Sequence, residues 1–137
     1  MTQENKELLL RDLCARLNTN LVCSIYRIDD QGIGYRNEIL HGYCRGDNWY
    51  EFYFGADCGI SIDDVSKIKQ YLFPLSSMTE EQKVIYGDLC YSVIQSLAKN
   101  MQSELNELIN WLNANHFDYR GLIEKGLAID ATNLNIY

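Results

Sequence analysis

Hydrophobic positions follow a helical spacing at the start of the chain. Apolar side chains recur every three or four residues up to about residue 17, and Thr2 or Asn5 stands where a helix would be capped. The buried stripe is expected to comprise Leu10, Leu13, Cys14 and Leu17. The pattern predicts an amphipathic N-terminal helix that ends at the polar run 18–20.

Three segments rich in β-branched and aromatic residues come next. They are 21–29, 35–43 and 49–54. Short polar turns at 30–32 and 46–48 separate them, which predicts an antiparallel meander. Residues 68–72 form either a strand or a helical segment, and the tail 129–137 either adds an edge strand or stays loose. The sheet therefore has three to four antiparallel strands, and its closure into a small barrel is left open.

The C-terminal half returns to helical spacing. Thr79 and Gln82 form a capping box. The apolar stripe that follows comprises Tyr86, Leu89, Cys90, Val93, Ile94 and Leu97. Residues 99–100 end this helix, and Ser103 starts the next one, whose buried positions are Leu105, Leu108, Ile109 and Leu112. The short connection predicts an antiparallel helix pair.

A second, shorter helix is expected directly after residues 113–115. Asp118 is its N-cap, Leu122 and Ile123 supply its buried side, and Gly126 has the place of a left-handed C′ residue. Residues 103–128 would then form a helix–corner–helix unit. The predicted fold class is α+β: an N-terminal helix, an antiparallel sheet and a C-terminal helical half whose stripes cover one sheet face.

Two strings of the sequence resemble a known family. They are YLFPLSSMTEEQK and WLNANHFDYRGLIEKGLA. Both look like parts of small uncharacterised proteins found in gut anaerobes and in their phages and mobile elements. The strings cover about a quarter of the chain, and 21–60 diverges most. The resemblance implies a context, that of a phage-related accessory protein in the cytoplasm, and it transfers no catalytic residue.

Composition narrows the classes of function. The 137 residues are expected to form a single domain. The net charge of −7 is spread over the chain without a basic patch, which argues against duplex nucleic acid as a ligand. The five cysteines are Cys14, Cys23, Cys44, Cys58 and Cys90. They form no C-x-x-C pair, which argues against a zinc site. We expect free thiols in a reducing cytoplasm, no membrane span, no metal and no cofactor.

The corner 115–120 offers candidate chemistry. His116 and Asp118 could form an acid/base pair, as in a hydrolase, and Arg120 could clamp an anion. In the simpler interpretation these residues have structural roles: they cap the helices, fill the corner with an aromatic side chain and form one arginine–carboxylate ion pair. A small anionic ligand such as a nucleotide signal, held by His116, Tyr119 and Arg120, is the alternative function.

The aromatic strand 49–54 carries the favoured hypothesis. Alternation sends Trp49, Glu51 and Tyr53 to one face of the sheet, and the opposite rings to the other. One face must cover the helices, so the other, rich in tyrosine and tryptophan, either forms a contact surface or lies under a loop. We therefore expect a non-enzymatic binding protein that uses Trp49 and Tyr53 to contact a protein partner, with a homodimer through the aromatic face as the expected oligomer.

Overall fold

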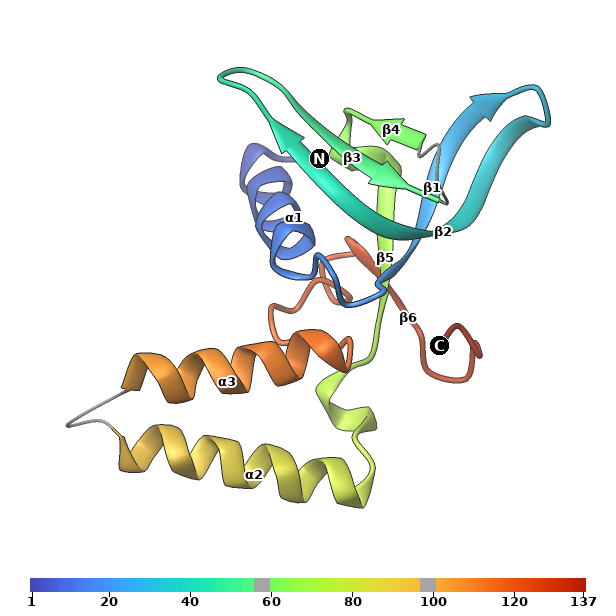
Figure 1. Cartoon of the computed structure of the whole chain (residues 1–137). Helices are drawn as coiled ribbons and strands as arrows, with labels where there is room; N and C mark the ends of the chain where they lie inside the picture. The colour runs from blue at the N-terminus through green and yellow to red at the C-terminus, as the bar shows by residue number, and fades with distance from the viewer. Residues whose placement is uncertain (56–59, 97–100) are drawn as a thin grey trace.

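The computed structural model of the protein describes residues 1–55, 60–96 and 101–137. A curved sheet carries one helix on one face, and a helical hairpin stands to the side (Figure 1). Three features of the sequence, Cys58, Leu97 and the helix stop at 99–100, lie outside the described residues. The first helix, α1 Gln3–Ala15, begins as predicted: the Asn5 backbone N–H donates to the Thr2 hydroxyl at 3.2 Å.

Among the described residues, the sheet has six strands in the order β4-β3-β2-β1-β5-β6. They are β1 Val22–Asp29, β2 Gly32–Arg45, β3 Tyr50–Phe54, β4 Ile60–Ile62, β5 Ile68–Leu72 and β6 Ala128–Asp130. The predicted meander β1–β2–β3 is confirmed, with both pairs antiparallel. The prediction of a three- to four-stranded antiparallel sheet is confirmed in part: the segment 68–72 and the start of the tail form strands β5 and β6, but β4 is an additional strand and β6 pairs with β5 in parallel. Strands of three residues are too short for alternation to reveal.

The core lies between α1 and the inner face of the sheet. Its buried side chains include Leu9 and Leu13 from α1, Cys23 and Ile25 from β1, Leu40 from β2, Phe52 and Phe54 from β3, and Ile68 and Leu72 from β5. The alternation predicted for β3 is therefore confirmed: Phe52 and Phe54 point into the core. The α1 stripe is rotated from the predicted one, since Leu9 replaces Leu10 as a fully buried position. Two short 3-10 turns, η1 Val65–Lys67 and η2 Leu75–Ser77, flank β5.

Helices α2 Glu80–Gln95 and α3 Met101–Ala114 form the antiparallel hairpin (Figure 1). The capping box is confirmed, with the Gln82 backbone N–H donating to the Thr79 hydroxyl and the Thr79 backbone N–H donating to the Gln82 side chain. The hairpin does not cover the sheet, contrary to the prediction. Its apolar residues form a second cluster around Met78, Leu112 and Phe117.

The predicted second helix of the helix–corner–helix unit is absent from the described residues, which form turns between Asp118 and Leu127. Gly121 adopts φ +70°, a left-handed conformation that interrupts a right-handed helix. The predicted end chemistry is nevertheless present. Gly126 has φ +69°, its N–H donates to the Ile123 carbonyl, and the Leu127 N–H donates to the Leu122 carbonyl, which is the Schellman pattern.

Candidate functional site

The predicted acid/base residue Asp118 is engaged by the backbone. Its two carboxylate oxygens accept hydrogen bonds from the N–H groups of Leu122 at 2.9 Å and Ile123 at 2.8 Å. Its own N–H donates to the carbonyl of Phe73 at 2.8 Å, and the Phe73 N–H donates to the His116 carbonyl at 2.9 Å. The two backbone bonds with Phe73 join the corner to the end of β5. The carboxylate of Asp118 caps the turn that follows it.

His116 is buried against the C-terminal residue. Its ring stacks on Tyr137, with ring centres 3.9 Å apart and planes 11° from parallel. Burial lowers the pKa of His116 to about 4, and repulsion from the Arg16 guanidinium acts in the same direction. The imidazole is therefore neutral near pH 7. A hydrolase site would need His116 and Asp118 to converge on a pocket, and this geometry gives that alternative no support.

Arg120 is paired with a buried carboxylate on α1. Its Nη1 donates to Asp12 Oδ1 at 2.9 Å, while Arg16 Nε donates to Asp12 Oδ2 at 2.7 Å. Arg16 also donates to the Phe117 carbonyl at 2.7 Å, and Arg120 lies over the Tyr119 ring at 4.9 Å. Tyr119 itself donates to the side chain of Asn113. The structure thus brings His116, Tyr119 and Arg120 into one region, where Arg120 joins α1 to the corner.

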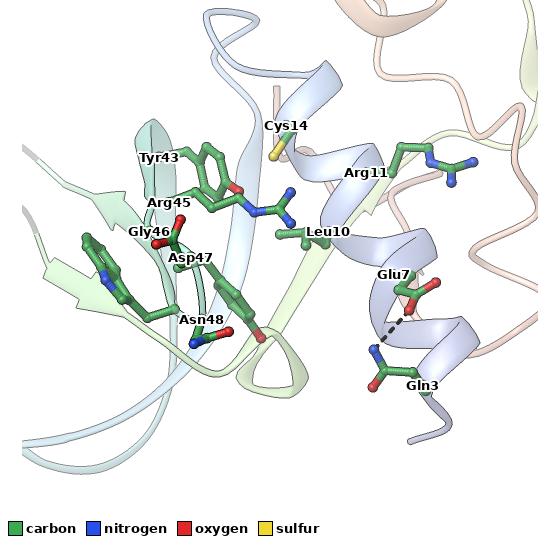
Figure 2. Close-up of a pocket in the computed structure, with 12 residues that line it drawn as sticks. Gln3, Glu7, Leu10, Arg11, Cys14, Tyr43, Arg45, Gly46, Asp47 and Asn48 are labelled. Carbon is green, nitrogen blue, oxygen red and sulfur yellow. Dashed lines mark hydrogen bonds between the residues drawn. The ribbon is translucent and has the colours of Figure 1, made fainter.

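Trp49 lies elsewhere, at the rim of a groove between α1 and the β2–β3 turn. The groove has a volume of about 550 Å³. Figure 2 shows Tyr43 and Arg45 extending from β2 toward Leu10 and Cys14 of α1. Trp49 is 54% exposed, and its indole packs so closely on Gly46 that a Cβ there would lie 2.1 Å from the indole nitrogen.

The groove carries both signs of charge. Arg11 and Arg45 line it together with Glu7 and Asp47. Burial raises the pKa of the Cys14 thiol, and a hydrogen bond with Tyr43 and the charge of Arg45 oppose that shift. The thiol is therefore mainly protonated near pH 7, which makes it a weak nucleophile. The groove has the size of a small-ligand site without an evident reactive group.

Tyr53 lies on the opposite, outer face of the sheet. It pairs with Gly42 of β2 and donates from its hydroxyl to Glu51 at 2.9 Å, and this hydrogen bond raises the pKa of Tyr53. Since paired residues of antiparallel strands point to the same side, the outer face continues along β2 through Ile39 and Tyr35. The two aromatic residues predicted to act together are thus separated by the sheet.

The outer face becomes most apolar at the tip of the β1–β2 hairpin. Here β1 and β2 extend beyond β5 and β3, which pair only with Cys23–Ile25 and with β2 from Leu40 onward, so residues 26–35 form a two-stranded ribbon (Figure 1). Tyr26 pairs with Tyr35 and Ile28 with Ile33. We call these four residues the outer ribbon face.

The outer ribbon face is unusually exposed for its composition. Ile28 is 72% exposed, Ile33 69% and Tyr35 65%. Tyr26 and Tyr35 pack edge to face, with ring centres 5.2 Å apart. Isolated exposed apolar residues are common, whereas adjacent ones on a single face mark contact sites. Sequence reasoning missed this surface, although the alternation in 26–28 and 33–35 was visible.

The inner face of the same ribbon is charged. Arg27 and Arg36 both bind Asp29, and Arg27 also lies 3.9 Å from Glu38. Arg36 donates to the Gln31 side chain at 2.6 Å, and the Gln31 N–H donates to Asp29 at 2.8 Å, which braces the turn. A two-stranded ribbon is marginally stable alone. This network supports the ribbon from its charged side and leaves the apolar side free.

A hollow lies at the β1 edge of the ribbon. It has a volume of about 400 Å³ and is lined by residues from both faces of β1 and from the segment before β5: Tyr26, Arg27, Ile28, Asp29, Ile62, Asp63 and Lys67. Ile62 is buried, so the hollow has an apolar floor beside four charged residues, Arg27, Asp29, Asp63 and Lys67. Such a cavity can receive one side chain of a bound protein.

The fold and this surface define a small α+β protein with one projecting apolar ribbon. Comparisons with protein-family models, with curated proteins and with solved structures found no match. Within residues 1–55, 60–96 and 101–137, no helix is long and apolar enough to cross a membrane. The same residues contain no cluster of three or more His, Cys, Asp or Glu side chains that could hold a metal ion.

Proposed function

We propose that this protein is a non-enzymatic binding protein that contacts another protein through its outer ribbon face. The observation that supports this proposal is the exposure of Ile28, Ile33 and Tyr35 on one side of a braced ribbon. Water-exposed apolar surface of this kind is stabilised when a partner covers it. Tyr53 and Ile39 extend the same face toward the middle of the sheet, which enlarges the contact.

The partner's chemistry follows from the surface. The contact has an apolar centre, so the partner presents apolar side chains to it. Because this chain carries a net charge of −7, a partner with a basic border is favoured over an acidic one. A contact of standard size buries on the order of 800 Å² on each side, and a few aromatic or large aliphatic residues dominate its energy.

We also propose that the protein is a phage-related or mobile-element accessory protein that acts in the cytoplasm. The resemblance of the two sequence strings supports that context. The thiols of Cys14, Cys23, Cys44 and Cys90 are free, as is usual in a reducing compartment.

The test is affinity capture of the tagged chain from cells that produce it, with three variants in parallel. Ile28→Ser combined with Ile33→Ser removes the apolar centre at little cost in stability, because both side chains are mainly exposed. Tyr53→Ala tests the extension of the face, and Ile85→Ser on α2 is the matched control for loss of an exposed isoleucine. A partner that is retained by the control and lost in the double variant supports the proposal. A partner that survives the double variant contradicts it.

The groove supports a second candidate, the binding of a small molecule with an acidic group. Arg45 points into the groove (Figure 2), and none of the ion pairs found between described residues involves it. A ring of the ligand would lie against Trp49. Thermal shift against a panel of nucleotides and amino acids, with Arg45→Gln as the comparison, tests this candidate. A flat response across the panel contradicts it.

A further inference from the structure

Helix α2 carries a second apolar stripe that no part of the described chain covers. Val84, Gly87, Tyr91 and Ile94 recur at intervals of three and four residues, which is the spacing of a helix–helix seam. Val84 is 64% exposed, Tyr91 63% and Ile94 61%. The stripe facing α3, which includes Tyr86 and Val93, lies on another side of the helix and is partly buried.

We propose that two copies of the chain associate through this stripe, with their α2 helices antiparallel. The two hairpins would then pack against each other through α2 alone. The second copy is chosen as the occupant because the stripe is complementary in size to itself. About a two-fold axis near residue 89, Val84 lies opposite Ile94 of the second copy, and Gly87 lies opposite its Tyr91.

Gly87 is otherwise a poor residue for this position. Glycine in the middle of a helix is less stable than alanine, and a Cβ added here would meet no atom of the chain within 4 Å. The fold of one copy therefore does not need glycine at residue 87. A tyrosine ring from a second helix does need it, since the absent side chain leaves the recess into which the ring fits.

Charge favours the same pairing. From Val84 to Ile94 the only charged residue is Asp88, in a chain whose net charge is −7. The last turn of α2 contains no basic residue to offset its free carbonyl groups. In the antiparallel arrangement Lys83 of each copy lies beside the last turn of the other helix and supplies that charge.

The parallel alternative fits less well. It would place Gly87 against Gly87 and Tyr91 against Tyr91, which leaves a void beside a crowded pair. The sheet also lies at one end of the hairpin (Figure 1), so a parallel pair would bring two acidic bodies together at that end. The antiparallel pair holds them at opposite ends of the paired α2 helices.

The size of the contact sets its strength. A 16-residue helix is about 24 Å long and presents a strip about 10 Å wide, so the contact covers a few hundred Å² per copy. This is below the roughly 800 Å² per partner of a standard interface. We therefore expect a reversible dimer with a dissociation constant in the micromolar range.

The test is sedimentation equilibrium of the full chain over a concentration series that reaches high micromolar values. Tyr91→Glu should raise the dissociation constant at least about tenfold, which is a loss of about 1.4 kcal/mol. Ile85→Glu is the matched control, because this exposed isoleucine lies about 100° around the same helix from Val84. It should leave the dissociation constant unchanged, and circular dichroism establishes that each variant is folded.

Gly87→Ala separates the dimer from simple helix stability. It should raise the melting temperature of the dilute, monomeric chain by a few degrees, because alanine is the better helix former. It should also weaken association, since the methyl group fills the recess for Tyr91. The proposal is overturned if the unmodified chain stays monomeric throughout the series, if Ile85→Glu dissociates it as strongly as Tyr91→Glu, or if Gly87→Ala strengthens association.

Discussion

Replacing Asp12 by asparagine should be among the most destabilising single changes that preserve side-chain size. Asp12 and Arg16 have no exposed side-chain surface, and Arg120 is only 20% exposed. The Asp12 carboxylate is the only anion paired with either arginine among the described ion pairs. The Asp12→Asn substitution keeps the shape and removes the charge, which leaves the Arg16 guanidinium buried and uncompensated.

The magnitude follows from this geometry. Breaking a buried pair by removing one partner costs about 3–5 kcal/mol, which is a large part of the roughly 5–15 kcal/mol by which small domains are stable. Arg120→Met leaves the Asp12–Arg16 pair intact and removes one hydrogen bond at a partly exposed site. We expect it to cost only about 1–2 kcal/mol.

Urea unfolding of both variants and of the unmodified chain measures the difference. The double variant Asp12→Leu with Arg16→Met should recover part of the loss, because apolar residues of similar volume often replace a buried ion pair without penalty. The reasoning is refuted if Asp12→Asn costs less than Arg120→Met, or if the double variant is less stable than Asp12→Asn alone.

Three further predictions concern single residues. The unfolded chain binds a proton on His116 near pH 6.5 and the folded chain only near pH 4, so the free energy of unfolding should fall as pH drops from 6.5 toward 4. His116→Asn, which tolerates the positive φ of 59°, should flatten that fall when urea unfolding is repeated across this range. Gly126→Ala should cost about 1–2 kcal/mol by thermal unfolding, because φ is +69° while the added Cβ has free space. Phe52→Ala should cost about 3–5 kcal/mol by urea unfolding and Tyr53→Ala much less, since only Phe52 is fully buried; equal losses would contradict the assignment of the two sheet faces.

Local chemistry was predictable from sequence wherever it depends on neighbours along the chain. The Thr79 capping box, the left-handed Gly126 and the turn at 30–32 each depend on residues within a few positions, and all are present. The helix expected after Asp118 failed for a local reason as well. Gly121 adopts a left-handed conformation, and glycine permits that conformation without requiring it.

Contacts between distant segments were not predictable in the same way. Asp12 and Arg16 have the spacing of a solvent-exposed helix pair, and only the approach of Arg120 and Phe117, about a hundred residues later, explains their burial. The exposure of Ile28 and Ile33 likewise depends on where β3 and β5 end. Alternation identifies the two faces of a strand, but the neighbouring elements decide which face is covered.

The candidate sites show the same difference between features set by neighbouring residues and features set by distant contacts. Trp49 and Tyr53 were expected on one surface, but the chain turns at Gly46 before β3 begins, so Trp49 lies at the groove and Tyr53 on the outer face. His116 and Arg120 are of residue types that are typical of catalytic or anion-binding sites. Their burial and their partners Tyr137 and Asp12 depend on tertiary contacts that no spacing along the sequence encodes.

Photo-crosslinking inside the producing cells tests the proposed protein contact most directly. A photoreactive amino acid replaces Tyr35 at the centre of the outer ribbon face, and in a matched control chain it replaces Glu81, an exposed residue of α2. We predict a discrete covalent adduct from residue 35 that is absent from residue 81 and is lost when Ile28→Ser and Ile33→Ser are both introduced. No adduct from residue 35, or an adduct that persists in the double serine variant, would contradict binding through the ribbon.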